Sequence, residues 1–281
     1  MSLGEYELIL FVASLAAGFV GSLAGLGGGI LIVPLLTVGF GVDVHYAIGA
    51  SIVSIIATSS GAAAAYIRDH ITNLRVGMFL ELATTVGAVA GALLSGLVNA
   101  SILYLAFALV LASSAVPLIV KLGEELPPEL AEDRWTTRLR LGSTYYDAVA
   151  GRYVHYSATR IPLGLVMMWL AGVLSGLLGI GSGAMKVLAM DTAMRLPMKV
   201  STTTSNFMIG VTAAASAGVY FNRGDVNPLL AAPVAFGVLL GALAGSRLLV
   251  HMRNATLRKF FVPVLLLVAV EMVLRGLGVR L

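Results

Sequence analysis

The sequence predicts an all-α polytopic membrane protein, because charged residues are few, uncharged runs are long, and one glycine pattern occurs twice. Hydrophobic residues make up 58% of the chain and charged residues 11%, whereas soluble domains carry about 25% charged residues. So few charges cannot cover a surface that faces water, but a surface that faces lipid is expected to be apolar. The buried helices of a large soluble core are therefore a much poorer explanation.

The uncharged runs place the helices along the chain. A membrane helix needs about 20 apolar residues, so the longest run is sufficient for two helices, with a break near Asn99 and Ser101. A shorter last span is expected at about 260–276 and includes Glu271. The runs without Asp, Glu, Lys, Arg or His are 8–42, 46–67, 82–120, 161–185, 200–222 and 226–246.

The glycine pattern indicates an internal duplication. Residues 18–29 read GFVGSLAGLGGG and residues 172–183 read GVLSGLLGIGSG, at an offset of 154. The same offset relates the motif Gly87–Gly91 to Gly241–Gly245. Self-similarity at a fixed spacing is the signature of a repeat. The expected units are two homologous halves, 1–120 and 161–281, and a polar connecting segment, 121–160.

Each half contains a Gly-rich interruption of an apolar run. A glycine within a helix costs about 1 kcal/mol relative to alanine, and non-helical backbone at membrane depth occurs only where protein or a water-filled cavity surrounds it. Interrupted segments at matching positions of two repeats are typical of a transporter binding site. The alternative is close helix packing through small residues. The glycines are Gly25, Gly27, Gly28 and Gly29 in the first half and Gly179, Gly181 and Gly183 in the second.

The basic residues favour a particular membrane topology. As one helix, residues 8–40 would be about 50 Å long, which exceeds the hydrocarbon thickness of about 30 Å. If both Gly-rich segments are re-entrant and the six other helices span, 14 basic residues lie on one side and 3 on the other. If all eight segments span, the split is 11 to 6. The positive-inside rule favours the first arrangement, which inverts the two halves, places 121–160 in the cytoplasm and leaves both ends outside.

The connecting segment 121–160 is either a linker or a regulatory element. Residues 129–141 are compatible with a short amphipathic helix. Tyr and Val alternate in 144–156 around Ala150-Gly151, which is typical of a β-hairpin. Six basic residues lie in this segment without an aromatic–basic pattern, so the net charge of +4 points to topology and not to a nucleic-acid partner.

Three charged residues lie within or beside the apolar runs. Lys186 follows 25 uncharged residues and the second Gly-rich interruption. A charge in a membrane segment costs at least about 3 kcal/mol and is usually functional, so Lys186 is expected to attract an anion; the alternative is a lysine that snorkels to the interface. Asp191 and Glu81 are candidate proton carriers, and Asp191 is also a candidate partner of Lys186. The first half has Ile32 in place of Lys186.

A run of polar side chains, Ser201-Thr-Thr-Thr-Ser-Asn206, interrupts another apolar stretch and corresponds to residues around Ser51 in the first half. Hydroxyl and amide groups donate hydrogen bonds to oxyanions without the cost of burying a full charge. The alternative is hydrogen bonding between helices, worth about 0.6 kcal/mol per contact. The candidates for substrate binding that this run adds are Ser51, Thr203, Ser205 and Asn206.

An intramembrane enzyme is the alternative for Ser182, which lies between glycines as a nucleophile would. The nucleophile elbow requires G-x-S-x-G, and residue 180 is Ile while residue 184 is Ala. No histidine lies inside a span, there is no cysteine, and no metal-ligand cluster is visible. We therefore expect a protein that is not an enzyme and uses no cofactor, with Ser182 as part of the substrate site.

The pattern Gly18-x-x-Gly21-x-x-x-Gly25-x-Gly27-Gly-Gly29-x-x-x-x-Pro34, followed by Ala47-Ile-Gly-Ala-Ser51, resembles the TauE/SafE sulfite exporter family. The resemblance extends over nearly the whole chain outside 121–160. It implies a secondary transporter of the cytoplasmic membrane that exports small sulfur-containing anions such as sulfite, sulfoacetate or related sulfonates, coupled to protons. Ser182 replaces the glycine of the first half, Leu188 replaces Pro34, and the insertion leaves substrate and regulation open.

Two other functions remain compatible with the sequence. One is an importer or channel for similar anions, and the other is a membrane scaffold that docks a soluble partner through 121–160. The expected partners are a small anion and the lipid bilayer, with a homodimer left open.

Overall fold

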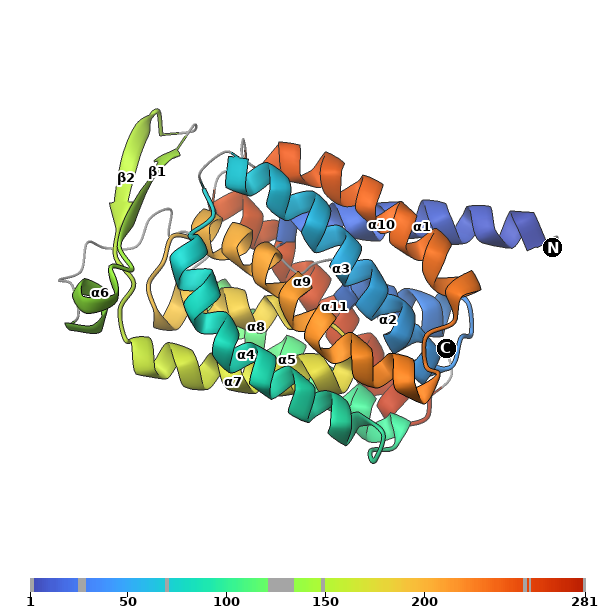
Figure 1. The fold of residues 1–281 in the computed structure, drawn as a ribbon. Helices are drawn as coiled ribbons and strands as arrows, with labels where there is room; N and C mark the ends of the chain where they lie inside the picture. The colour runs from blue at the N-terminus through green and yellow to red at the C-terminus, as the bar shows by residue number, and fades with distance from the viewer. Residues whose placement is uncertain are drawn as a thin grey trace.

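The computed structural model describes residues 3–24, 29–68, 71–120, 134–147, 150–249, 252 and 254–279. They form a helical bundle with a short β-hairpin at one end (Figure 1). In chain order the elements are α1 (Leu3–Ala24), α2 (Gly29–Pro34), the π-helix η1 (Leu35–Gly39), α3 (Val44–Arg68), α4 (Leu74–Ser95), α5 (Ala100–Val120), α6 (Arg134–Leu139), β1 (Ser143–Asp147), β2 (Arg152–Tyr156), α7 (Ile161–Leu178), α8 (Gly183–Leu188), the π-helix η2 (Ala189–Ala193), α9 (Met198–Arg223), α10 (Pro228–Leu249) and α11 (Asn254–Gly276).

The fold is that of an all-α polytopic membrane protein. Within the described residues, five helices are long and apolar enough to cross a membrane, namely α1, α3, α4, α7 and α10. The predicted break near Asn99 is confirmed, because α4 ends at Ser95 and α5 begins at Ala100. The predicted hairpin is also confirmed. Of the helix expected at 129–141, residues 134–139 form α6, and 129–133 lie outside the described residues.

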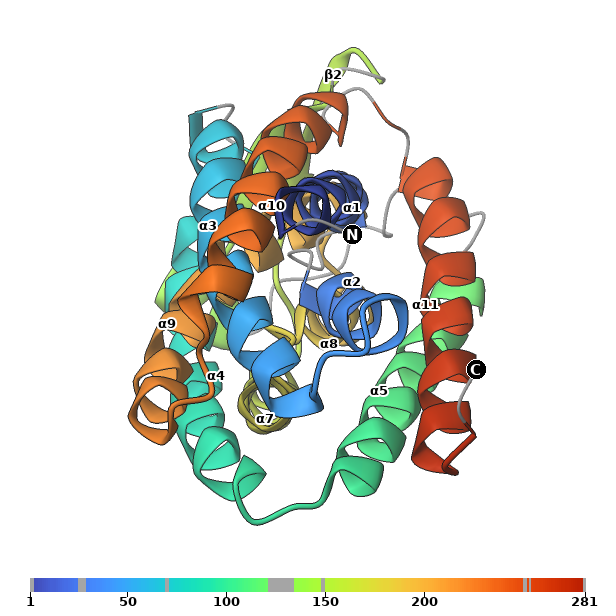
Figure 2. The same ribbon diagram turned by 90° about the vertical axis from the view of Figure 1, so that its right-hand side faces the viewer.

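The chain reverses direction after each Gly-rich segment. At the end of η1, the ring of Phe40 packs edge-on against Tyr6 of α1, with centroids 5.4 Å apart. Figure 2 shows α2 inside the ring of longer helices. In the second half, the backbone N–H of Thr159, just before α7, donates to the carbonyl of Met194, just after η2, at 3.0 Å. Each long helix and its short return arm therefore begin and end at the same end of the bundle.

The paired glycine motifs of α4 and α10 are explained by close packing. A Cβ on Gly91 of α4 would lie 2.0 Å from the carbonyl oxygen of Val173 in α7. A Cβ on Gly241 of α10 would lie 2.0 Å from that of Leu15 in α1. Both contacts are with backbone, which cannot rotate away, so only glycine permits the helices to approach this closely.

We expect Gly176→Ala to lower the free energy of unfolding by about 1–3 kcal/mol, the usual range for overpacking. The added Cβ would lie 1.9 Å from the carbonyl oxygen of Ala88 on α4. Gly218→Ala in α9 is the matched control, because nothing lies within 4 Å of its Cβ position. Thermal unfolding in detergent measures both variants, and equal melting temperatures would contradict this account of the packing.

The β-hairpin is attached to the bundle by a buried ion pair. Asp147, the last residue of β1, accepts a 3.0 Å hydrogen bond from the ammonium of Lys199 at the start of α9. Their side chains are 7% and 2% exposed, respectively. The hydroxyl of Tyr145 donates to the other oxygen of Asp147 at 3.2 Å. The ion pair between Asp147 and Lys199 therefore holds the hairpin against α9.

Asn73 fastens the same hairpin to α4. Its side-chain oxygen accepts from the N–H of Val76 and caps α4, while its amide donates to the hydroxyl of Tyr156 in β2 at 3.2 Å. Its backbone N–H donates to Thr204 of α9 at 3.0 Å. Asn73 therefore connects the hairpin with α4 of the first half and α9 of the second half.

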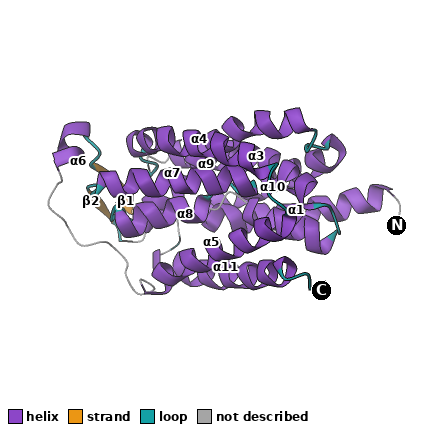
Figure 3. Ribbon diagram, turned by 90° about the horizontal axis from the view of Figure 1, so that it is seen from below, coloured by secondary structure: helices purple, strands orange, loops and turns teal. Residues whose placement is uncertain are grey.

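The two ends of the bundle differ in the charged residues and helix ends that lie there. Arg75, Arg140 and Lys199 gather around the hairpin, whereas the start of α1 and the end of α11 lie at the opposite end (Figure 3). At that far end, Arg223 pairs with Asp225 at 2.7 Å.

Candidate functional site

Ser51 of α3 connects Gly29, at the start of α2, with Gly179 of the second Gly-rich segment. The hydroxyl of Ser51 lies 2.8 Å from the carbonyl oxygen of Gly179 and 3.2 Å from that of Gly29. It has one proton, so it donates to one carbonyl at a time. Ser51 is fully buried. Gly25, Gly27 and Gly28, which the sequence assigns to this site, lie outside the described residues.

The second half makes an equivalent contact on α9. The hydroxyl of Ser205 donates to the carbonyl of Gly183 at 3.3 Å. The offset of 154 residues relates Ser205 to Ser51 and Gly183 to Gly29. Because the sequence repeat and the contact coincide, both serines hold the return arms of their own halves in the same way.

The backbone of the second interruption is tightly folded. Gly179, Gly181 and Ser182 all have positive φ angles, of 62°, 69° and 49°. Glycine adopts this region freely, whereas a non-glycine residue at positive φ is strained by about 1–3 kcal/mol. Within the described residues, the buried hydroxyl of Ser182 has no hydrogen-bond partner. A strained residue with an unsatisfied hydroxyl is a feature typical of ligand sites.

In the polar run of α9, some side chains hydrogen-bond within the protein, whereas others have polar atoms without a partner among the described residues. The hydroxyl of Thr203 donates to the carbonyl of Lys199 in its own helix, which supports the packing interpretation for this residue. The amide of Asn206 donates to the carbonyl of Ser22 in α1 at 3.1 Å, but its side-chain oxygen has no partner among the described residues. The hydroxyls of Ser201 and Thr202 are likewise buried without a partner there.

Lys186 is completely buried, so its ammonium does not reach the surface of the bundle. Its ammonium lies 3.6 Å from Glu81 of α4 and donates to the hydroxyl of Thr212 of α9. Thr212 in turn donates to Glu81 Oε1 at 2.5 Å. The partner of Lys186 is thus Glu81, and the pairing with Asp191 suggested by the sequence is not formed. Asp191 lies in η2 and is 1% exposed.

Sequence reasoning missed Thr212 and Thr85, whose hydroxyl donates to Glu81 Oε1 at 3.3 Å. Thr212 lies two helical turns after Ser205, on the same face of α9. That spacing was a usable signal, because it continues the polar face of the run. The other carboxylate oxygen of Glu81, Oε2, is buried without a hydrogen-bond partner in the part of the chain that the structure describes.

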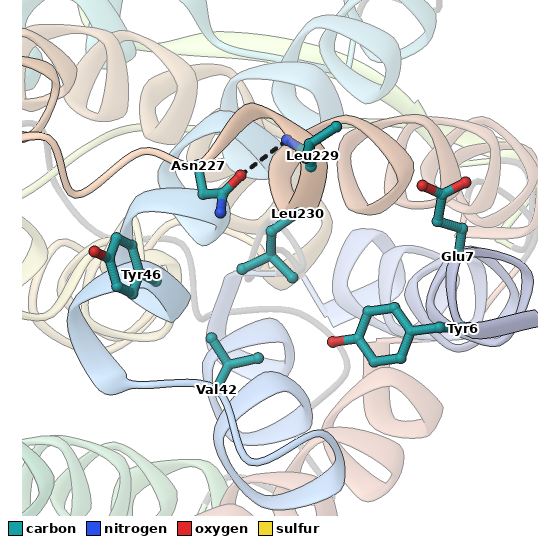
Figure 4. A pocket seen from close by; sticks show the side chains of 7 residues that line it. All are labelled: Tyr6, Glu7, Val42, Tyr46, Asn227, Leu229 and Leu230. Atoms are coloured by element: carbon teal, nitrogen blue, oxygen red, sulfur yellow. Dashed lines mark hydrogen bonds between the residues drawn. The ribbon is translucent and has the colours of Figure 1, made fainter. Parts of the chain in front are cut away.

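The structure has one surface pocket beside these groups and another at the end of the bundle. One is a groove of about 430 Å³ over α4 and α9 whose lining is mostly apolar but includes Glu81 and Thr85. The other, of about 280 Å³, lies at the end of the bundle where α1 begins (Figure 4). Its walls are Tyr6, Glu7, Val42, Tyr46, Asn227, Leu229 and Leu230. Among the described residues, no three His, Cys, Asp or Glu side chains are grouped as metal ligands would be.

Several helices able to cross a membrane, two matched chain reversals and a buried polar centre between them define a multi-pass membrane transporter. The chain belongs to the sulfite exporter TauE/SafE family, whose model matches residues 10–272. The resemblance found in the glycine motifs is thereby confirmed.

The relatives of the chain are themselves described as transporters. It is 30% identical over 280 residues to the probable membrane transporter protein YunE of Bacillus subtilis (strain 168), covering 96% of this chain and 98% of that protein. It is 28% identical over 241 residues to the probable membrane transporter protein YdhB of the same organism, covering 85% and 87%. The probable membrane transporter protein ORF9 of Sinorhizobium sp is 25% identical over 270 residues, covering 96% and 91%. No solved structure matches the chain.

Proposed function

We propose that the protein is a secondary transporter of the cytoplasmic membrane that exports small sulfur-containing anions, such as sulfite, sulfoacetate or related organosulfonates, coupled to protons. The observation that carries the proposal is the contact of Ser51 with both Gly29 and Gly179, one glycine from each half. The family description supports sulfur oxyanions as the substrate class. Uptake of the same anions is the second candidate.

We also propose that residues 1–120 and 161–281 are inverted repeats joined by a cytoplasmic segment, 121–160. The equivalent contacts of Ser51 and Ser205, and the chain reversals after η1 and η2, support this arrangement. Inverted repeats provide alternating access, because one half can rock against the other around a site at their interface. The substrate site would therefore lie between the two interruptions.

Within this site, hydroxyl and amide groups would bind the anion oxygens and Lys186 would supply positive charge. The unsatisfied hydroxyl of Ser182 supports this assignment. Asn206 is also proposed, through the second hydrogen of the NH2 group that donates to Ser22. Glu81 and Asp191 are the candidates for proton coupling. The remaining proposed contacts are with the backbone of Gly25, Gly27, Gly28, Gly29, Gly179, Gly181 and Gly183 and the side chains of Ser51, Thr203 and Ser205.

We expect sulfite or a sulfonate to raise the melting temperature of the purified protein, whereas chloride and acetate do not. A ligand that binds only the folded state adds about 2.7 kcal/mol at 100 times its dissociation constant. Ser51→Ala should remove most of this stabilisation, because the hydroxyl that joins the interruptions is lost. Ser60→Ala is the matched control on α3, since Ser60 is exposed and bonds only to Ile56 of its own helix.

Two results would contradict the proposed function. In the first, no sulfur-containing anion stabilises the wild-type protein more than chloride does. In the second, such an anion binds, but Ser51→Ala and Ser60→Ala bind it equally well, which would place the site elsewhere.

A further inference from the structure

We propose that Glu81 and the substrate anion compete for Lys186, so that the protein binds one proton together with one monovalent anion. This inference rests on the proposed function, because it concerns the charge balance of the same site. It makes the transporter a proton–anion symporter and gives a reason for the pairing of two ionised groups in the middle of the bundle.

The ammonium of Lys186 already has a carboxylate, that of Glu81, beside it. Lys186 is 0% exposed, and the carboxylate of Glu81 lies 3.6 Å from its ammonium. Thr212 bridges the pair, since it accepts from Lys186 and donates to Glu81 Oε1. Glu81 Oε2 is the oxygen that faces the ammonium, and it accepts no hydrogen bond among the described residues, so it can take a proton once the ammonium moves away.

Lys186 is close to the proposed substrate site along the chain. Its backbone N–H donates to the carbonyl of Ser182 at 3.0 Å, one helical turn after the second interruption. Thr212 lies on the same face of α9 as Ser205, which contacts Gly183. The long, flexible lysine stem can therefore present its ammonium either to Glu81 or toward the interruption.

Electrostatics make these two partners mutually exclusive. An ion pair has no net charge, but a second anion beside ionised Glu81 would leave one uncompensated negative charge in a low-dielectric interior, which is strongly unfavourable. When Glu81 takes a proton from water onto Oε2, its charge is lost and Lys186 is available to an anion. The site is then neutral again, with one proton and one monovalent anion bound.

The other charged groups on neighbouring elements have partners elsewhere or are distinct from this pair. On α9, Lys199 pairs with Asp147 and Arg223 with Asp225. Helix α7 contains no titratable side chain, and Tyr104 of α5 has Thr37 and Arg275 as polar neighbours. Tyr220 of α9 donates to the carbonyl of Gly176 in α7. Arg75 of α4 donates to the carbonyl of Arg140, and Asp191 is a separate buried carboxylate in η2.

The sign of the coupling follows from reciprocity. If a proton on Glu81 strengthens anion binding, then a bound anion strengthens proton binding by the same factor. The two ligands therefore move in the same direction. An inward proton gradient drives uptake, and net export occurs only while the outward gradient of the anion is the larger one. A dianion would leave the site with an uncompensated charge, so monoanions are selected.

The first experiment measures binding of methanesulfonate, a monoanion, and sulfate, a dianion, by thermal stabilisation across a pH series. For the wild type, methanesulfonate affinity should fall about tenfold per pH unit wherever binding takes up one proton per anion. Glu81→Gln, which mimics the protonated state, should bind methanesulfonate with little dependence on pH. Sulfate should bind much more weakly to both proteins.

The second experiment measures flux in proteoliposomes, and its first part uses the wild type alone, so that part does not depend on the folding of any variant. Wild-type methanesulfonate flux should follow an imposed pH gradient and should be insensitive to an imposed membrane potential, because the transported unit is neutral. Glu81→Gln should carry current and lose accumulation driven by the pH gradient.

The outcomes separate this inference from the proposed function. If neither sulfite nor methanesulfonate binds at any pH, the proposed function fails and the inference fails with it. If they bind but the wild-type flux carries current, only the inference is overturned. The same conclusion follows if the pH dependence survives in Glu81→Gln or is removed instead by Asp191→Asn.

Discussion

Replacing Lys186 with Met should lower the free energy of unfolding by about 3–5 kcal/mol, the range found when one partner of a buried ion pair is removed. The substitution preserves most of the side-chain volume but leaves Glu81, which is 6% exposed, without its cation. We expect a large fall in the melting temperature in detergent. Lys259→Met is the matched control, because Lys259 is exposed and surface substitutions usually change stability by less than about 0.5 kcal/mol.

The double variant Lys186→Met/Glu81→Gln tests the cause of that loss. It removes both charges, so it should recover much of the stability that the single variant loses. If the double variant is as unstable as the single variant, the lost packing of Lys186 and not the stranded carboxylate is responsible. The ion pair would then contribute little to the stability of the fold.

Asp147→Ala should release the β-hairpin from the bundle. The change strands the ammonium of Lys199, which is 2% exposed, and removes the acceptor of Tyr145. Breaking the pair is expected to cost about 3–5 kcal/mol, and the loss should be local because the hairpin packs at one end of the bundle (Figure 1). Limited proteolysis within 134–160 should therefore accelerate much more than global unfolding.

Arg152→Ala is the control for this second prediction. Arg152 is exposed and lies opposite Asp147 in the hairpin register, so its loss should leave proteolysis unchanged. Lys199→Met combined with Asp147→Ala should restore part of the protection. Equal cleavage rates in Asp147→Ala and the wild type would mean that the remaining contacts, such as that of Asn73 with Tyr156, are sufficient to hold the hairpin.

Much of the fold could be predicted from local features of the sequence. Runs without charge set the positions of the long helices, and the glycine-rich interruptions set the positions where they end. The alternation of Tyr and Val between 144 and 156 predicted a hairpin that the structure confirms, with Tyr145 and Tyr156 on its inward face. These features depend on residues that are neighbours in the sequence, so a single sequence is sufficient to predict them.

The partners of the buried charges could not be predicted in the same way. Lys186 and Asp191 are five residues apart, and their proximity in sequence suggested an ion pair. The cation instead faces α4, because Lys186 lies on the side of α8 that faces Glu81 and Thr212. The contact of Asp147 with Lys199 likewise depends on how the hairpin docks. Such pairings are set by helix rotation and packing, which no single stretch of sequence contains.

The close glycine contacts have a consequence for the biogenesis of the protein. The backbone of α1 packs against α10, and that of α4 packs against α7. During translation α1 enters the bilayer long before α10 has been made, so the small-residue face of α1 is exposed to lipid until then. Assembly is therefore a late event, and the two halves reach their final structure by interlocking with each other instead of folding one after the other.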